Sequence, residues 1–166
     1  MSRGARVLVT GMSGTGKSAA LAELARRGFP VVDTDVGGWT EWRPEPDGWV
    51  WREDRIAELL AEERKRTLYV AGCVSNQGTF SDRFDAVVLL SAPAEVILGR
   101  VESRTTNDYG KRPGESELIL SHLDSVEPLL RATCTHELDA GRPLAEVVDE
   151  LVAIGQASAD AVSSRG

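Results

Sequence analysis

The sequence is poor in the features that mark secreted or membrane-bound chains. Its 166 residues include only two cysteines, Cys73 and Cys134, which lie far apart and outside any CxxC or Cys/His spacing. We therefore expect reduced thiols rather than a disulfide framework or a metal site. No apolar run reaches the ~18–20 residues that a bilayer span needs, and the apolar run after Met1 is too short for a signal-peptide core. These absences predict a cytoplasmic protein.

An excess of basic residues is also missing, because the formal net charge is −7. Proteins that bind long nucleic acids present a basic face to the phosphate backbone, so an acidic balance argues against that class. It leaves room for a small anionic ligand that is held by a few local arginines. The composition leaves the oligomeric state open between monomer and dimer.

What the sequence does contain is an alternation of short apolar runs and helical patterns. We expect strands at 6–10, 29–32, 67–71, 84–90 and 135–138, and helices at 17–27, 52–66, 93–104, 115–132 (with a kink or break at Pro128) and 143–154. This alternation predicts an α/β three-layer sandwich around a five-stranded, mostly parallel sheet. We expect one domain over residues 1–155, with an insert at about 36–51, and a disordered polar tail at 156–166.

The segment between the first strand and the first helix is a phosphate-binding loop, or Walker A motif. Residues 11–18 read GMSGTGKS and match GxxxxGK[ST] at every fixed position. Glycines let the backbone curl so that its N–H groups surround phosphate oxygens, and the helix adds its positive N-terminal end. We expect Lys17 to be catalytic and Ser18 to offer its hydroxyl to Mg²⁺. The residues expected to bind ATP here are Gly11, Ser13, Gly14, Thr15, Gly16, Lys17 and Ser18.

The second predicted strand ends in two aspartates, Asp33 and Asp35. At positions i and i+2 of an extended chain, both carboxylates point to the same side. A strand beside the first one would bring them close to the γ-phosphate, where one could hold Mg²⁺ and the other could accept a hydroxyl proton. The simpler alternative is a pair of turn aspartates that cap a loop.

Together, these motifs resemble the nucleoside-monophosphate-kinase superfamily of P-loop kinases. The Gly28–Asp35 stretch is most similar to shikimate kinases, and the resemblance implies that Asp33 helps to hold Mg²⁺ while Asp35 holds the substrate hydroxyl. Shikimate kinases continue with isoleucine-glutamate and substrate-binding arginines, and they carry a triple-glycine turn after the third strand. This chain instead has VGGW at 36–39 and AGC at 71–73. The resemblance therefore covers the catalytic half and does not predict shikimate as the acceptor.

The same resemblance implies a small lid at about 105–114 that closes over ATP. Arg104 and Arg112 are the predicted lid arginines that contact the transferred phosphate, and Arg131 is a further partner. The turn from 136 to 144 resembles the adenine-contacting loop, which implies that Gly141, Arg142 and Pro143 contact the base. The alternatives are a solvated basic loop and an ordinary strand-to-helix turn.

The site for the phosphate acceptor is less clearly indicated by the sequence than the phosphate-binding loop is. Four tryptophans lie at 39, 42, 49 and 51, where they could stack on a flat ring or a sugar, or belong to the core. Nearby arginines could hold an acidic group, and polar residues after the third strand could recognise hydroxyls. The candidate acceptor residues are Asp35, Trp39, Trp42, Arg55, Gly72 and Asn76.

The sequence therefore favours an ATP- and Mg²⁺-dependent phosphotransferase that acts on a hydroxyl of a small molecule, either a metabolite or a natural product. A nucleoside-monophosphate kinase is a weaker alternative, because Asp35 would repel an acceptor phosphate. A nucleotide-binding switch or partner module without a small-molecule acceptor is an alternative of another class.

Overall fold

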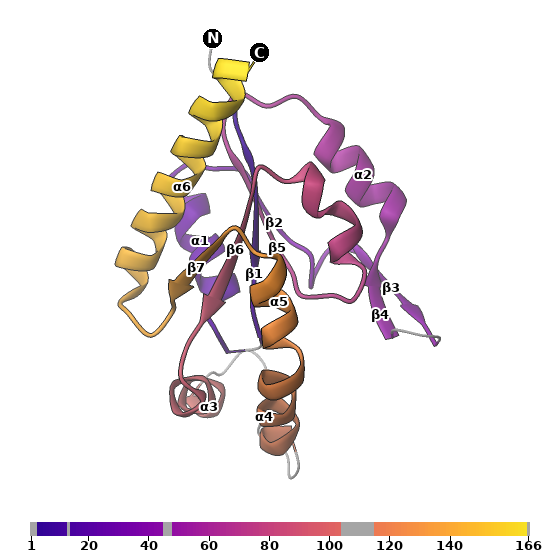
Figure 1. The fold of residues 1–166 in the computed structure, drawn as a ribbon, viewed down its shortest axis with the longest axis vertical. Coiled ribbons are helices and arrows are strands. Elements are labelled where there is room, and N and C mark those ends of the chain that lie inside the picture. The colour runs from indigo at the N-terminus through magenta and orange to yellow at the C-terminus, as the bar shows by residue number, and fades with distance from the viewer. Residues whose placement is uncertain (1–2, 13, 45–47, 104–114, 166) are drawn as a thin grey trace.

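A computed structural model of the chain describes residues 3–12, 14–44, 48–103 and 115–165 (Figure 1). Its centre is a five-stranded sheet in the order β2-β5-β1-β6-β7, in which every neighbouring pair is parallel. The strands are β1 (Arg6–Thr10), β2 (Val31–Asp33), β5 (Leu68–Ala71), β6 (Ala86–Ser91) and β7 (His136–Asp139). Helices cover both faces, which confirms the predicted α/β three-layer architecture.

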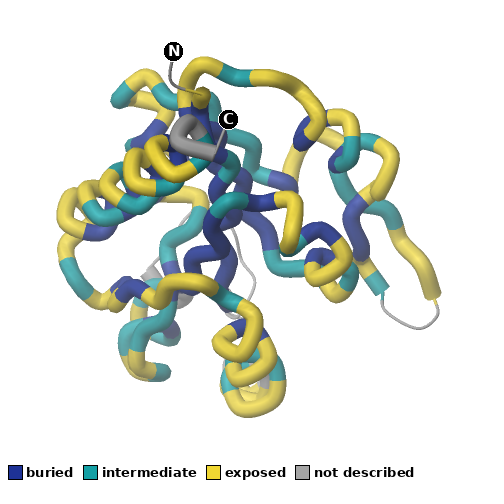
Figure 2. Tube along the Cα trace, turned by 45° about the horizontal axis from the view of Figure 1, so that its top comes forward, coloured by how far each residue is buried: buried dark blue, intermediate teal, exposed yellow. Residues whose placement is uncertain are grey.

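Alternate residues of β1 explain why both faces of the sheet are apolar. Val7 and Val9 pack into a core that α1 and α6 cover, whereas Leu8 packs into a second core with Ile56 and Phe80. A parallel strand that is buried on both faces reads as a continuous apolar run, as this one does. The helical elements are α1 (Lys17–Arg26), α2 (Glu53–Ala61), the 3₁₀ helix η1 (Gln77–Arg83), α3 (Ala94–Ser103), α4 (Glu115–Ser125), α5 (Glu127–Thr133) and α6 (Leu144–Arg165). Figure 2 shows the buried residues gathered on the central strands.

The insert contains regular structure that the sequence analysis did not specify. Its ends form an antiparallel hairpin of β3 (Thr40–Arg43) and β4 (Gly48–Trp51), which stands beside the parallel sheet (Figure 1). The predicted break near Pro128 is confirmed, because α4 ends at Ser125 and Pro128 lies in the first turn of α5.

The prediction of a disordered tail at 156–166 is wrong, because α6 continues to Arg165. A glycine such as Gly155 is common at the end of a helix, but here it allows close packing of α6 against Tyr69. A Cβ on Gly155 would lie 2.3 Å from the Tyr69 hydroxyl oxygen. The following turn is held to the body, since Ala159 is buried. The small side chains that suggest disorder in the sequence are the ones that let α6 approach the sheet.

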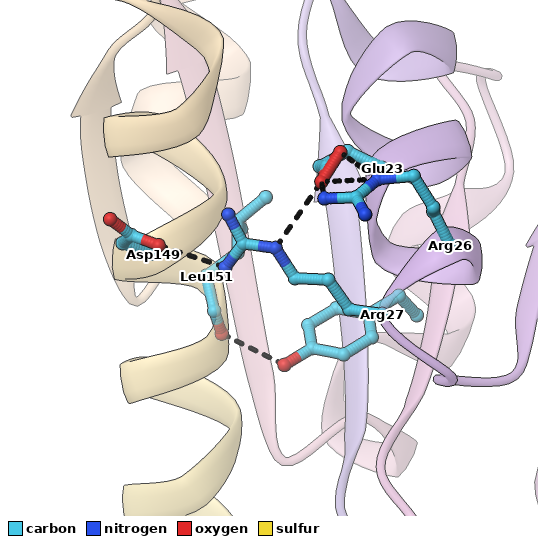
Figure 3. Close-up of polar contacts among 6 residues, drawn as sticks. Glu23, Arg26, Arg27, Asp149 and Leu151 are labelled. Carbon is cyan, nitrogen blue, oxygen red and sulfur yellow. Dashed lines mark hydrogen bonds and ion pairs between the residues drawn. The ribbon is translucent and has the colours of Figure 1, made fainter.

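An ion pair also fastens α6 to α1. The Arg27 guanidinium, just after α1, donates to Asp149 Oδ1 at 2.8 Å and lies within 3.5 Å of Glu23 Oε1 (Figure 3). The pKa of Glu23 is lowered, first by its hydrogen bond to Arg26. None of the helices in the described ranges has the length and apolar character that a membrane crossing requires.

Candidate active site

The phosphate-binding loop joins β1 to α1 at the carboxyl edge of the sheet. Gly14 and Gly16 have φ values of 87° and 93°, a left-handed backbone that glycine adopts without strain. The Lys17 ammonium donates to the carbonyl oxygens of Gly11 at 2.6 Å and Met12 at 3.2 Å. The loop thus curls around the lysine. Ser13, which the motif also includes, lies outside the described residues.

The two residues predicted to hold Mg²⁺ are in contact. Ser18 Oγ donates to Asp33 Oδ2 at 2.7 Å, and Asp33 Oδ1 accepts the backbone N–H of Asp35 at 3.1 Å. The expectation that the aspartate strand lies beside β1 is wrong, because β5 lies between β2 and β1. Ser18 nevertheless meets Asp33, since it projects from α1, which packs against β2.

Lys17 and Asp35 line one pocket of about 190 Å³ with Met12 and Cys73. Although Asp35 as a residue is exposed, partial desolvation of its carboxyl raises its pKa, and the neighbouring Asp33 carboxylate raises it further. The Lys17 ammonium acts in the opposite direction on the same pKa. A carboxylate beside a phosphate-loop lysine, with an increased affinity for a proton, suits a group that receives a hydroxyl proton.

A second pocket, of about 220 Å³, lies on the other side of the phosphate loop. Arg100 lines it, and its guanidinium donates to the carbonyl oxygen of Thr15 at 3.3 Å and to that of Ala140. Arg142 also lines this pocket and pairs with Glu150 at 2.9 Å. The full lining is Thr15, Gly16, Ala19, Leu90, Arg100, Ala140, Arg142, Leu144 and Val147.

This pocket brings part of the predicted adenine loop to the phosphate loop. Arg142 lines it directly, Gly141 donates its N–H to Asp139 Oδ1 at 2.8 Å, and Pro143 precedes the first turn of α6. Arg100 is the residue that the sequence analysis passed over in favour of the predicted lid arginines. Arg104 and Arg112 themselves lie outside the described residues. The signal for Arg100 was its place on the helix that precedes the predicted lid.

Arg131, the further predicted partner of the phosphate, contacts neither of these two pockets. Its guanidinium donates to Glu137 Oε1 at 2.8 Å and Glu127 Oε1 at 3.0 Å. These contacts lie at a separate open pocket of about 530 Å³ beside the ends of β6 and β7. The Arg131 guanidinium lowers the pKa of Glu137, with a second hydrogen bond from Ser91. The partners of Arg131 in the structure are thus two carboxylates, and its contact with the phosphate stays a prediction.

The predicted acceptor-side tryptophans have different environments. The Arg55 guanidinium lies over the Trp39 ring, 4.3 Å from its centroid, and donates to the carbonyl oxygens of Gly37 and Gly38. Trp42 is 59% exposed and packs edge-on against Trp49 across the hairpin. Trp39 and Arg55 therefore brace the turn that follows Asp35, and Trp42 stands at the surface.

Gly72 and Asn76 make structural contacts instead of lining the Lys17–Asp35 pocket. Asn76 accepts the backbone N–H of Trp51 at 2.9 Å and donates to its carbonyl oxygen at 3.0 Å. A Cβ on Gly72 would lie 2.5 Å from Thr34 Oγ1, so a larger residue would collide with that side chain. Both residues therefore order the backbone around the site, and their assignment to the acceptor stays a prediction.

The chain is similar to known proteins in both sequence and fold. The model of a family described as an AAA domain matches residues 7–121. A search of curated proteins found no significant match. Solved structures match the chain over nearly all of its length. A gluconokinase from Sinorhizobium meliloti 1021 aligns with a TM-score of 0.65 at 24% identity, covering 100% of this chain and 99% of its own.

Two further structures have the same fold. A shikimate kinase from Bacteroides thetaiotaomicron aligns with a TM-score of 0.64 at 19% identity, covering 89% of this chain and 96% of its own. A sugar kinase from Janibacter sp. HTCC2649 aligns with a TM-score of 0.54 at 21% identity, covering 94% and 98% of the two chains. The resemblance to shikimate-kinase-like P-loop proteins that the motifs indicated is confirmed at the level of the fold. The chain belongs to the AAA domain family and has the P-loop kinase fold.

Proposed function

We propose that the protein is an ATP- and Mg²⁺-dependent phosphotransferase that acts on a hydroxyl of a small molecule. The observation that carries the proposal is the pocket where the phosphate-loop Lys17 and the Asp35 carboxylate face the same space. A P-loop alone would support any nucleotide-binding role. A carboxylate placed beside its lysine supports the activation of an acceptor hydroxyl.

The Ser18 and Asp33 side chains fit a magnesium ion. Mg²⁺ prefers oxygen donors and retains several of its waters, and these residues offer a hydroxyl and a carboxylate in direct contact. Bound there, the ion would offset charge on the β- and γ-phosphates. The chain's own contribution is to hold the two oxygen donors together at the start of α1 and the end of β2.

In the proposed reaction the acceptor oxygen attacks the γ-phosphorus of ATP, the bond from that phosphorus to the β–γ bridging oxygen breaks, and ADP leaves. Asp35 orients the acceptor hydroxyl and receives its proton, and Lys17 neutralises charge on the phosphate oxygens. In this proposal the adenine base of ATP binds in the pocket that Arg100 and Arg142 line. Arg104 and Arg112 would add charge from the predicted lid, as the family resemblance implies.

The negative charge of Asp35 distinguishes between acceptors that carry a phosphate and acceptors that carry only hydroxyls. Nucleoside-monophosphate kinases must hold an acceptor phosphate, and a carboxylate at this position would repel it. The similar structures include kinases of shikimate and of sugars, and those names support a hydroxylated acceptor of similar size. Shikimate is not favoured, because the acceptor-side motifs at 36–39 and 71–73 differ from those of shikimate kinases. In addition Arg55, one of the arginines predicted to be able to hold an acidic group, contacts Trp39 and two carbonyl oxygens.

The proposal is tested by measuring ATP consumption by the purified protein with nucleosides, sugars, shikimate-like acids, aminoglycosides and nucleoside monophosphates. We expect stimulation by a hydroxylated acceptor that disappears in Lys17→Ala and Asp35→Asn. Phosphate transfer to nucleoside monophosphates would replace the proposal with the monophosphate-kinase alternative. Tight nucleotide binding without stimulation by any acceptor would favour a nucleotide-binding switch.

A further inference from the structure

A buried hydrogen bond connects the β3–β4 hairpin to the turn that carries the two aspartates. Trp51, at the end of β4, is fully buried, and its indole N–H donates to Thr34 Oγ1 at 2.9 Å. Thr34 is also fully buried, and its hydroxyl in turn donates to the carbonyl oxygen of Ala71 at 2.8 Å. Thr34 lies between Asp33 and Asp35 in the sequence. The indole therefore contacts the residue that lies between the two aspartates.

The position of Trp51 is fixed from a third segment as well. The Asn76 side chain, in the loop after β5, bonds both the N–H and the carbonyl of Trp51, as a neighbouring strand would. Gly72, in the same loop, leaves room for the indole, because a Cβ there would lie 3.0 Å from the ring. The end of β2, the end of β4 and the loop after β5 thus meet at this one tryptophan.

The Trp51 indole makes apolar contacts as well as a hydrogen bond. Its ring packs near Phe80 and Phe84, with centroid separations of 6.1 Å and 6.3 Å, in an apolar core. What phenylalanine lacks is the N–H donor, and a buried donor of this kind needs a partner. In this chain the partner is the hydroxyl that lies between the carboxylates assigned to the metal and the acceptor.

We propose that Trp51 is a positioning residue for the reaction: its hydrogen bond to Thr34 fixes the Asp33–Asp35 turn and couples the acceptor-side hairpin to both carboxylates. The inference rests on the proposed function, which assigns Asp33 to the magnesium ion. It adds a contact that no phosphate-loop motif contains, and it explains why Gly72 and Asn76 lie next to the site without entering the pocket.

The test measures how strongly Mg²⁺ improves nucleotide binding, which needs no knowledge of the acceptor. Binding of a fluorescent ADP analogue is titrated with Mg²⁺ and with EDTA, and the ratio of the two affinities is the readout. Trp51→Phe retains a ring and removes the donor. Trp49→Phe is the matched control, because Trp49 lies on the same hairpin and is 60% exposed. A melting temperature is recorded for each variant.

We expect Trp51→Phe to lower the Mg²⁺-dependent ratio about five- to tenfold, the effect of one lost hydrogen bond. Its affinity in EDTA should stay at the wild-type value, and Trp49→Phe should match wild type throughout. A lower melting temperature with an unchanged ratio would overturn the proposal, since the contact would then serve stability only. Equal losses with Mg²⁺ and with EDTA would overturn it as well.

Substitutions at Thr34 test the same hydrogen bond from its acceptor side. They test the proposed positioning role even if Trp51→Phe does not fold. Thr34→Val removes the hydroxyl at nearly constant shape and should lower the ratio, whereas Thr34→Ser retains the hydroxyl and should preserve it. Equal ratios in these two variants would overturn the proposal. Failure of every acceptor in the kinase assay would contradict the proposed function while leaving this Mg²⁺ measurement intact, so the two failures are distinguishable.

Discussion

Ser18 Oγ donates a hydrogen bond of 2.7 Å to Asp33 Oδ2, so the first turn of α1 touches the end of β2 although β5 separates β2 from β1. The second oxygen of Asp33 accepts the backbone N–H of Asp35. Both oxygens of Asp33 are therefore oriented by protein donors. This arrangement pre-positions the oxygen donors that a magnesium ion would use.

Removing the negative charge of Asp33 should weaken the effect of Mg²⁺ on nucleotide binding. In Asp33→Asn the amide retains one oxygen but offers no charge, so the Mg²⁺ concentration for half-maximal enhancement should rise about tenfold or more. The measurement is a Mg²⁺ titration at constant fluorescent ADP. Asp54→Asn is the control, because Asp54 is an exposed residue of α2. Enhancement at the wild-type Mg²⁺ concentration would remove Asp33 from the metal assignment.

Asp35 should be needed for transfer and not for nucleotide binding. Loss of a general base typically costs about 10²–10⁴-fold in rate, so Asp35→Asn should lower acceptor phosphorylation by that order. Its affinity for the ADP analogue should remain within about twofold, because a single partly exposed charge contributes little to binding. Full turnover by this variant, once an acceptor is known, would exclude Asp35 from proton transfer.

The same substitution carries a pH-dependent effect on stability. Burial and the Asp33 carboxylate raise the folded-state pKa of Asp35, so the folded protein binds its proton more tightly than the unfolded chain. The resulting stability is present below the unfolded pKa and is lost as pH rises through the folded pKa. We therefore expect Asp35→Asn to melt above wild type at neutral pH, with the difference shrinking as the pH is lowered through the acidic range. A difference that is constant with pH would contradict the raised pKa.

The sequence predicted those parts of the site that are local in the chain. The phosphate loop is eight contiguous residues between a strand and a helix, and Asp33 follows an apolar strand, so both were visible without coordinates. The strand order could not be predicted from the sequence, because nothing in the composition of β2 indicates that β5 lies between β2 and β1. The contact between Trp51 and Thr34 depends on the hairpin and on the glycine at position 72. No local sequence pattern at either place predicts that contact.

Arg100 illustrates the same limit and provides a further test. Its guanidinium joins the carbonyl oxygens of Thr15 and Ala140 beside the pocket assigned to the base. Arg100→Leu should lower affinity for the ADP analogue about tenfold, the effect of one lost charged contact. It should do so equally with Mg²⁺ and with EDTA, since Ser18 and Asp33 do not line the pocket that Arg100 lines. Arg83→Leu, an exposed arginine at the end of η1, should have no effect. A loss seen only with Mg²⁺ would contradict this assignment.

The last prediction concerns the C-terminal half of α6. Replacing glycine by alanine in a helix usually stabilises a protein by about 0.5–1 kcal/mol. At Gly155 the opposite is expected, because the new methyl would lie 2.3 Å from the hydroxyl oxygen of Tyr69. That hydroxyl donates to the Leu151 carbonyl at 2.9 Å in a fully buried position, so it has little freedom to move.

We expect Gly155→Ala to lower the free energy of unfolding by about 1–3 kcal/mol, as overpacking does. In a Tyr69→Phe background, where the oxygen is absent, the same change should cost less, and urea denaturation of the four proteins in the cycle measures the difference. Ala157→Gly is the companion variant, because Ala157 is exposed in the same helix. It should cost about 0.5–1 kcal/mol if residues beyond Gly155 are helical, and nothing if they are disordered. A neutral Ala157→Gly together with a stabilising Gly155→Ala would show that α6 ends at Ile154, as the sequence alone suggested.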